Sequence, residues 1–222
     1  MICLFGGTFD PVHAGHVHAA GAVSDALALA KIHMLLSARP GHRDEPGASV
    51  DQRWRMLELA CADDPRLYPD DTEVRRARRL GRPSYTVETL EEYRRQTPDA
   101  VLVWVVGSDA YRDLGTWHRW REVFELCNLL VLNRPGAPLQ LSGELAAITQ
   151  ARRLSGAPGE PAGGVLVLDA PMRDVSATRI RQALRAATPA GERFSAAVED
   201  LLPPAVYTYI KQHQLYGVVS DA

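Results

Sequence analysis

The sequence predicts a single α/β domain, residues 1–222, with a doubly wound parallel sheet, helices on both faces of the sheet and a small C-terminal helical part. Two observations point to this fold class. Short segments that are almost entirely apolar alternate with longer segments of helical pattern, as in proteins built from βαβ units. The length of 222 residues suffices for one sizeable domain and leaves little room for two.

Strands are expected where the chain is apolar at nearly every position, because strands covered on both faces of a parallel sheet have this character. The expected strands are Ile2–Phe5, Ile32–Leu36, Val101–Val106, Leu129–Leu132 and Val165–Leu168. Right-handed connections between such strands build a Rossmann-like sheet.

Helices are expected between these strands and after them. The clearest start lies before Asp51, where Ser49 and Gln52 have the spacing of a capping box. Residues 37–49 and 155–164 are rich in proline and glycine and are expected to be loops. The expected helices are Val17–Leu29, Asp51–Ala62, Thr86–Gln96, Trp120–Leu126, Leu141–Arg153, Ala177–Ala187 and Ala205–Gln214.

Composition excludes several classes of protein. The formal net charge of −2 gives no global reason to expect a nucleic-acid partner or an anionic membrane. No apolar run approaches the roughly 20 residues that a membrane helix needs, and the N-terminal MICLF lacks the basic region of a signal peptide. Cys3, Cys61 and Cys127 form no C-x-x-C pair and are expected to be small core residues in a reducing compartment. We therefore expect a cytoplasmic protein.

The least ordinary segments of the sequence follow the expected strands. GGTFDPVHAGH, residues 6–16, follows the first strand, and RDVSATRIR, residues 173–181, follows the last. Arg39–Arg43, Gly107–Asp109 and Arg134–Gly136 follow the other three. Ligands of open α/β sheets bind beyond the carboxyl ends of the strands, so these five loops predict a ligand cleft.

His13 and His16 admit three interpretations. The first is a structural turn that exposes two histidines by accident. The second is a metal site that also uses His18, but His16 and His18 diverge on a helix and no cysteine or H-E-x-x-H pattern completes a ligand set. The third, which we favour, is a phosphate site. Gly6 and Gly7 would let the backbone approach an anion, and a helix starting near His13 would add N–H donors. Gly15 would leave room for a ligand against the helix start.

A second possible anion site lies near the C-terminus. Ser176 is expected to cap a helix, and Thr178 and Arg181 are three residues apart, one turn along the same face. Alone, this pattern is typical of a capped helix with arginines facing solvent. Its coincidence with the first motif favours a role in phosphate binding.

Together the two motifs resemble the signatures of the nucleotidylyltransferase superfamily, an H-x-G-H turn and a late (S/T)-x-T-x-I-R helix start. Within it, the chain is similar to the bacterial nicotinate-nucleotide adenylyltransferases. Ala177 stands where serine is commoner, Arg43 stands where lysine is frequent, and the loop at residues 155–164 is longer than expected. The further matching segments are PGHR (40–43), PSYTVETL (83–90), GSDAY (107–111), TWHRW (116–120), NRPG (133–136) and LLPPAVYTYIKQHQLYG (201–217).

The resemblance implies transfer of the adenylyl group of ATP to nicotinate mononucleotide, with Mg²⁺ bound through the ATP phosphates and no metal held by protein side chains. It implies catalytic roles for His13, His16 and Arg181. The implied ATP-binding residues are Gly6, Gly7, Phe9, His13, His16, Gly107, Asp109, Arg134, Ser176, Thr178 and Arg181. Those implied for the mononucleotide are Thr8, His42 and Arg43 at its phosphate and Thr86 and Trp117 at its pyridine ring. Taken alone, Trp117 is more typical of a core residue.

Other functions remain open at this point. One is a sister adenylyltransferase acting on nicotinamide mononucleotide or phosphopantetheine, although the latter type usually lacks the PSYT and TW segments. Another is a nucleotide-sensing protein that keeps the fold without the chemistry, against which the intact His13, His16 and Arg181 argue. A class I aminoacyl-tRNA synthetase fragment would share the H-x-G-H turn, but no KMSKS-like lysine loop or basic RNA-binding face is present.

Overall fold

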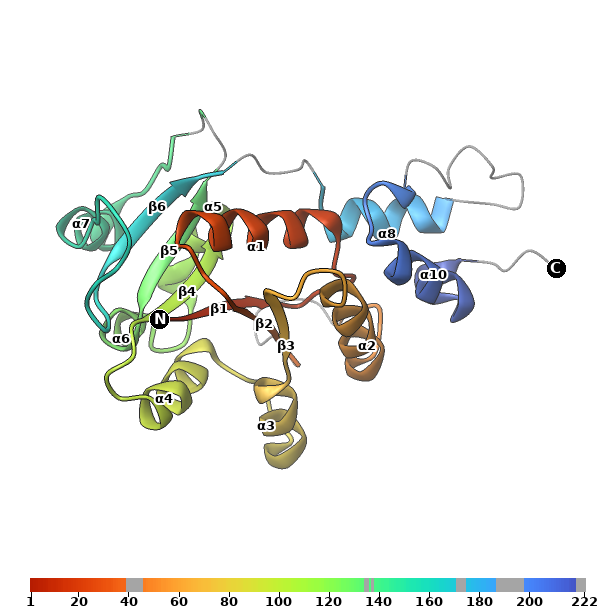
Figure 1. The fold of residues 1–222 in the computed structure, drawn as a ribbon, viewed down its shortest axis with the longest axis horizontal. Helices are drawn as coiled ribbons and strands as arrows, with labels where there is room; N and C mark the ends of the chain where they lie inside the picture. The colour runs from red at the N-terminus through yellow and green to blue at the C-terminus, as the bar shows by residue number, and fades with distance from the viewer. Residues whose placement is uncertain (39–45, 134–135, 137, 171–174, 187–197, 219–222) are drawn as a thin grey trace.

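The computed structural model describes residues 1–38, 46–133, 136, 138–170, 175–186 and 198–218. Within them, six parallel strands form one sheet in the order β3-β2-β1-β4-β5-β6, with helices on both faces (Figure 1). The predicted doubly wound fold is confirmed. The strands are β1 (Ile2–Gly7), β2 (Ile32–Leu36), β3 (Leu67–Asp70), β4 (Leu102–Gly107), β5 (Asn128–Asn133) and β6 (Val165–Asp169).

One strand, β3, is missing from the sequence prediction. Its four residues, LYPD, form no apolar run, and Tyr68 is exposed. It lies at the edge of the sheet beside β2, where proline is tolerated because one side of an edge strand needs no ladder hydrogen bonds. The five predicted strands are all present; β2 has the predicted bounds and the others differ by one or two residues.

The predicted helices are also present, and Thr86–Gln96 and Trp120–Leu126 have the predicted bounds. The capping box is confirmed, because the Gln52 N–H donates to Ser49 Oγ at 3.2 Å and the Ser49 N–H donates to Gln52 Oε1 at 2.9 Å. The helices α3 and α5 were not predicted. The helices are α1 (Ala14–Ala26), α2 (Val50–Cys61), α3 (Thr72–Leu80), α4 (Thr86–Gln96), α5 (Ser108–Arg112), α6 (Trp120–Leu126), α7 (Gly143–Ala151), α8 (Ala177–Ala186) and α10 (Pro204–Gln212), with 3₁₀ turns η1 (Leu114–Thr116) and η2 (Leu215–Gly217).

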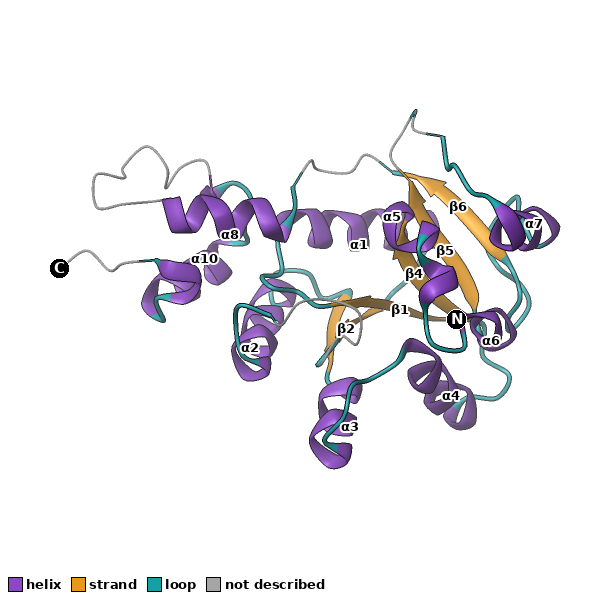
Figure 2. Ribbon diagram, turned by 180° about the vertical axis from the view of Figure 1, so that it is seen from behind, coloured by secondary structure: helices purple, strands orange, loops and turns teal. Residues whose placement is uncertain are grey.

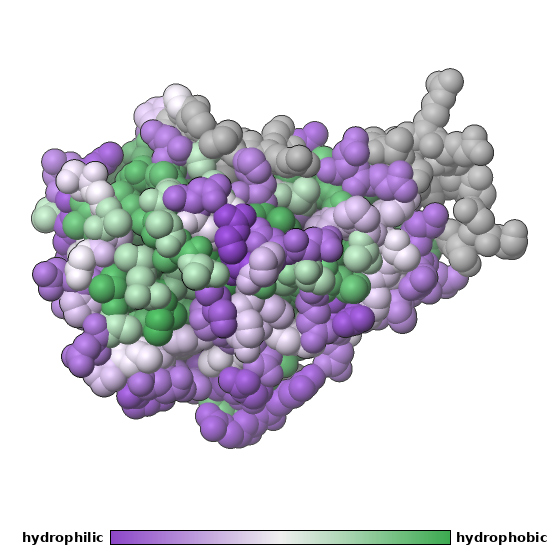
Figure 3. Space-filling view, viewed as in Figure 1, coloured by the Kyte–Doolittle hydropathy of each residue, from purple (hydrophilic) through white to green (hydrophobic). Residues whose placement is uncertain are grey.

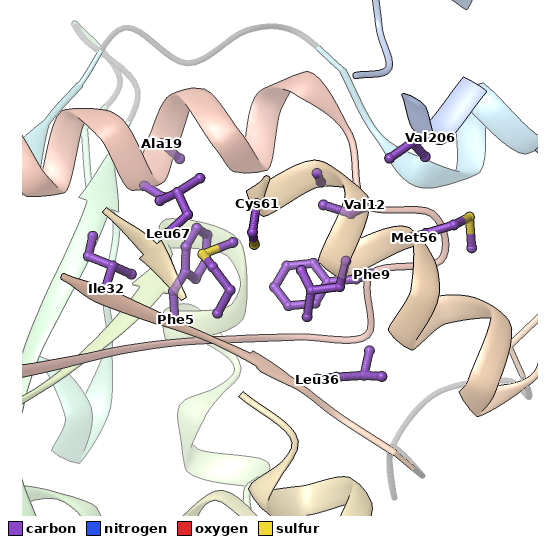
Figure 4. Close-up of a cluster of buried hydrophobic side chains, with 14 of the residues drawn as sticks. Phe5, Phe9, Val12, Ala19, Ile32, Leu36, Met56, Cys61, Leu67 and Val206 are labelled. Atoms are coloured by element: carbon purple, nitrogen blue, oxygen red, sulfur yellow. The ribbon is translucent and has the colours of Figure 1, made fainter. Parts of the chain in front are cut away.

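The core lies on both faces of the sheet, because alternate strand residues point to opposite sides. Phe5, Ile32 and Leu36 contribute to the cluster on the α1 and α2 side, where Met56 and Cys61 of α2 meet them (Figure 4). Strand residues that point to the opposite face, such as Leu4 and Leu35, contribute to a second cluster with residues of α4 and α6. The three cysteines are buried and free, as predicted.

The C-terminal helical part lies beyond the carboxyl edge of the sheet. In Figures 1 and 2, α8 lies next to the beginning of α1, and α10 packs against α2. The Ala14 N–H at the start of α1 donates to Leu201 O at 2.9 Å, which joins the two ends of the chain. No helix in the described ranges is long and apolar enough to cross a membrane.

Candidate active site

The strand order reverses between β1 and β4, and ligands of open α/β sheets bind at such a point. There β1 ends at Gly7 and β4 ends at Gly107. Because all six strands are parallel, the loops that follow them share one edge of the molecule, as predicted. His42, Arg43 and Arg134 lie outside the described residues.

The turn after β1, residues 8–13, brings an aromatic side chain back under the site. Phe9 has φ 47°, in the left-handed region that non-glycine residues seldom occupy, and is 2% exposed. Its ring meets the His16 ring edge-on at a centroid distance of 5.0 Å. A Cβ at position 7 would lie 2.6 Å from the Phe9 ring, so Gly7 permits this packing. The Phe9 ring therefore packs against the His16 ring and limits its movement.

Packing also explains two other glycines of this motif. A Cβ on Gly6 would lie 2.5 Å from the indole of Trp104. A Cβ on Gly15 would lie 2.6 Å from Val175 Cγ1, so the expectation that this glycine leaves room for a ligand is wrong. The side chain of Val175, just before α8, already fills that space.

His13 and His16 form a stacked pair at the beginning of α1. Their ring centroids are 3.7 Å apart, with an angle of 22° between the planes. The His13 backbone N–H donates to His16 Nδ1 at 3.2 Å. In the neutral ring this acceptor role leaves the proton on Nε2, which can then donate a hydrogen bond.

His13 is held as a neutral imidazole. Burial lowers its pKa to about 4, so the ring carries no charge at pH 7. Its buried Nδ1 has no hydrogen-bond partner among the described residues, which is unusual for a buried polar atom. Both rings lie at a helix start, where N–H groups and the helix dipole favour anions. The pair can therefore donate hydrogen bonds to a phosphate.

The second motif meets the first through an arginine. The Arg179 N–H donates to Ser176 Oγ at 3.3 Å, which confirms the predicted cap of α8. Arg181 Nη1 donates to the backbone oxygen of Asp10 at 2.6 Å, and Nη2 donates to Thr178 Oγ1 at 3.4 Å. Two segments more than 160 residues apart in sequence thus present two histidines and an arginine at one place.

The end of β4 and the first turn of α5, where a loop is predicted, present a carboxylate beside open space. A Cβ on Gly107 would meet nothing within 4 Å, and its φ of −70° requires no glycine. The Asp109 side chain is 80% exposed and pairs with Arg112. This strand end leaves room for a ligand group that a carboxylate can bind.

The segments 83–90 and 116–120 lie together. The Tyr85 and His118 rings are 4.5 Å apart, and Arg119 Nη2 donates to Glu91 Oε1 at 2.7 Å. Thr86 is the first residue of α4, and the side chain of the N-cap residue Tyr85 makes no cap hydrogen bond. Trp117 is half-buried and packs against the core cluster beside α4.

No group of three or more histidine, cysteine, aspartate or glutamate side chains that could hold a metal ion occurs within the described ranges. His13 and His16 face each other in a stack, while His18, further along α1, is exposed.

Sequence reasoning missed a buried arginine that organises the site. Arg53 of α2 is 1% exposed and donates to four backbone carbonyls in the loops after β1 and β2. The helical period of the buried residues Met56, Leu57, Ala60 and Cys61 places Arg53 on the same face, so a charge on an otherwise apolar stripe was the available signal. The accepting oxygens belong to Thr8, Ser37, Ala38 and Ala48.

Comparisons with known proteins identify the family of this chain. The cytidylyltransferase-like family model matches residues 4–183. The "Probable nicotinate-nucleotide adenylyltransferase" of Stenotrophomonas maltophilia (strain K279a) is 45% identical over 219 residues, covering 96% of this chain and 95% of the relative. The protein of the same name from Chromobacterium violaceum is 42% identical over 217 residues, covering 96% and 97%.

A solved structure shares the fold. The Plasmodium falciparum nicotinic acid mononucleotide adenylyltransferase complexed with NaAD superposes with a TM-score of 0.74 at 15% identity, covering 98% of each chain. The family match spans both the histidine turn and Arg181. The chain therefore belongs to the cytidylyltransferase-like family, together with these proteins named nicotinate-nucleotide adenylyltransferases.

Proposed function

We propose that this chain is a nicotinate-nucleotide adenylyltransferase, which converts ATP and nicotinate mononucleotide into nicotinate adenine dinucleotide and pyrophosphate. The observation that carries the proposal is the stacked pair of His13 and His16 at the beginning of α1, in the same turn whose Asp10 backbone oxygen accepts from Arg181. The names of relatives at 45% and 42% identity support this choice of substrates.

The reaction needs little acid–base chemistry from the protein. A phosphate oxygen of the mononucleotide, already ionised at neutral pH, forms a bond to the α-phosphorus of ATP. The bond from that phosphorus to the bridging oxygen breaks, and pyrophosphate leaves with the electron pair. Attack is direct and in line, with no covalent enzyme intermediate. Catalysis then rests on positioning and on donors aimed at the developing charge.

The described residues can supply these donors. His16 Nε2, with His13 beside it, would donate to the ATP phosphates and stabilise the charge that grows near the α-phosphorus. Arg181, with the Ser176–Thr178 start of α8, would hold the departing pyrophosphate. We place the backbone of Gly6, Gly7 and Phe9 beneath the phosphates. We assign Arg134 to ATP through the family resemblance alone.

A metal ion fits this site when it arrives with ATP. The groups that face the proposed phosphate position are imidazoles, a guanidinium and N–H groups, with no cluster of carboxylates among the described residues. Mg²⁺ bound to the phosphates would share the neutralisation of their charge.

The adenosine would lie where β4 meets α5, and the pyridine ring of the mononucleotide would lie at the start of α4. Gly107 and Asp109 suit the adenosine ribose, because a carboxylate can accept from vicinal hydroxyls. Thr86 and Trp117 suit the pyridine ring, since N–H groups at the start of α4 can donate to the nicotinate carboxylate and the indole offers stacking area. We propose Thr8, His42 and Arg43 for the mononucleotide phosphate.

The test is a substrate panel. Pyrophosphate release is followed at saturating Mg-ATP with nicotinate mononucleotide, nicotinamide mononucleotide or phosphopantetheine. An amide would present its NH₂ to a site built of donors, a mismatch of about 1–3 kcal/mol for each contact. We expect kcat/KM to favour the nicotinate nucleotide by at least ~100-fold, which requires about 2.7 kcal/mol.

The other outcomes identify the alternatives. Equal efficiency or a preference for the amide would place the chain with the nicotinamide-using enzymes and remove the role given to Thr86. Release with phosphopantetheine alone would move it to a different sister enzyme. Nucleotide binding without release from any substrate would indicate a sensor.

A further inference from the structure

A buried carboxylate, Asp10, connects four segments of the chain at the site. Asp10 is 6% exposed, so its charge must be satisfied by partners within the protein. Oδ2 accepts from the Gly47 N–H at 2.8 Å, and Oδ1 accepts from the Ala48 N–H at 3.1 Å. Oδ1 also accepts from the hydroxyl of Tyr216 at 2.8 Å. The fourth segment is α8, because Arg181 donates to the backbone oxygen of Asp10 and lies 3.6 Å from Oδ2.

Tyr216 is held tightly where it meets Asp10. Its φ of 60° lies in the left-handed region, which is unfavourable for an aromatic residue and persists only where surrounding contacts fix it. The ring is 6% exposed, and a Cβ on Gly47 would lie 3.2 Å from two of its carbons and 3.6 Å from Arg181 Cδ. Burial raises the pKa of Tyr216, and the charge of Asp10 adds to the effect, so the hydroxyl keeps its proton to donate.

These contacts fix the direction in which Asp10 faces. The Tyr216 hydroxyl and the two N–H groups hold the carboxylate on one side, and in this arrangement the backbone oxygen of Asp10 accepts from Arg181. Arg181 in turn has one Nη committed to Asp10 and the other to Thr178. A donor held at both ends needs little reorganisation when a phosphate arrives.

We propose that Tyr216 is a positioning residue, which orients Arg181 toward the pyrophosphate through the carboxylate of Asp10. Tyr216 is 206 residues from Asp10, touches no reacting atom in this scheme and acts only through its hydroxyl. The catalytic part of this inference rests on the proposed function. The structural part, that the Tyr216 hydroxyl orders the Arg181 side chain, does not depend on the proposed function.

The first experiment removes the hydroxyl and keeps the ring. We expect Tyr216→Phe to lower kcat roughly 10-fold, because a small misplacement of a catalytic group is costly, while KM for nicotinate mononucleotide stays unchanged. Tyr209→Phe is the matched control: it removes a tyrosine hydroxyl from the neighbouring α10, where the half-buried ring stacks on His213, and should leave kcat unaltered.

A double-mutant cycle separates positioning from general packing. If the hydroxyl acts through Arg181, Tyr216→Phe should lower kcat less than 2-fold in an Arg181→Lys background, because residues of one hydrogen-bond network do not act additively. Equal fold-losses of kcat in both backgrounds would overturn the proposal, and so would an unchanged kcat in the single variant.

A readout independent of catalysis keeps the two proposals distinct. In ¹⁵N NMR spectra of the full chain, we expect the Arg181 guanidinium signals to be resolved in the wild type and in Tyr209→Phe, and to broaden in Tyr216→Phe. Unchanged Arg181 signals in Tyr216→Phe would refute the positioning role. If the signals broaden although the wild type releases no pyrophosphate, the proposed function fails and the Tyr216–Asp10–Arg181 link stands.

Discussion

Two stacked imidazoles determine what the first turn of α1 can do. His13 stays uncharged because burial lowers its pKa to about 4, and the His13 N–H fixes the orientation of the His16 ring. The pair can thus donate to phosphates, and His13 does so without a positive charge that would have to be desolvated. The helix start and Arg181 supply the remaining attraction for the anion.

His16 is the residue whose loss should affect turnover most. We expect His16→Ala to lower kcat by ~100-fold or more, since one preorganised transition-state donor is worth roughly 3–4 kcal/mol. The measurement is steady-state pyrophosphate release, with circular dichroism to check folding. His18→Ala, on the exposed side of the same helix, is the control and should keep wild-type turnover. Near wild-type kcat in His16→Ala would contradict the catalytic role.

Arg181→Lys tests the planar guanidinium separately from its charge. A lysine keeps the positive charge but cannot reach Asp10, Thr178 and a phosphate at once with a rigid fork. We expect kcat/KM for ATP to fall about 10-fold or more, in line with the loss of a charged hydrogen bond. Arg185→Lys, at the exposed last turn of α8, should change nothing. Unchanged ATP kinetics in Arg181→Lys would reduce Arg181 to a structural contact.

Local sequence motifs predicted some of these residues and missed others. His13, His16, Ser176 and Arg181 were found because their spacing within a helix start is itself informative. Asp10 stood in the first motif without a role, because its partners Gly47 and Tyr216 are far away in sequence. Contacts between residues so far apart in the sequence produce no local sequence pattern from which they could be predicted.

At the scale of elements, β1 and α4 have a local sequence pattern that predicts them, whereas β3 and α3 do not. The first two have apolar patterns of the right period and were predicted. In α3, TEVRRARRL, the buried face includes Glu73 and Arg76 beside Val74 and Ala77, so apolar periodicity is weak. The surface over α3, at the bottom of Figure 3, is correspondingly hydrophilic. Hydrogen bonds and an ion pair with Thr89 and Glu92 of α4 satisfy these buried polar side chains.

The contact with α4 should make stability depend on pH. Glu73 Oε1 accepts from the Thr89 hydroxyl of α4 at 2.8 Å, and burial raises the Glu73 pKa from 4.5 to about 7. Between these two values the folded chain holds a proton that the unfolded chain has lost. The free energy of unfolding therefore falls as pH rises through this window. The stabilisation is complete below about pH 4.5 and is lost above about pH 7.

We expect Glu73→Gln to remove this decline, which is on the order of 2–3 kcal/mol. The measurement is urea unfolding at several pH values from 5 to 8, reported as the difference between variant and wild type. Other titrating groups, among them His13, then cancel. Glu125→Gln changes a carboxylate that is 67% exposed and should leave the wild-type profile intact. A profile of Glu73→Gln parallel to that of the wild type would show that this carboxyl does not titrate in the window.

At the scale of the whole molecule, the C-terminal helices share the core of the sheet. Ile180 of α8 and Val206 and Ile210 of α10 are fully buried in the same cluster as Phe5 of β1 and Met56 of α2. Hydrogen bonds of two buried charged side chains also join this core to the loops. Arg53 donates to Ser37 O in the loop after β2, and Asp10, in the loop after β1, accepts from the Gly47 N–H. The site is thus assembled from both ends of the chain, and its geometry depends on how α10 packs against α2 and α8 packs against η2.

This shared core predicts that the chain unfolds as one cooperative unit. In scanning calorimetry we expect a single transition, with the calorimetric enthalpy equal to the van't Hoff enthalpy. ATP at 100 times its Kd should move the whole transition upward, because binding to the folded state alone adds about 2.7 kcal/mol. Ile210→Ala should lower the free energy of unfolding by about 2–5 kcal/mol and move the same single transition to lower temperature without splitting it, since it opens a cavity in the core that α10 shares with α2. Two separate transitions in the wild type, or an early transition confined to α8 and α10 in Ile210→Ala, would show that the C-terminal part is an independent unit and would contradict the single domain.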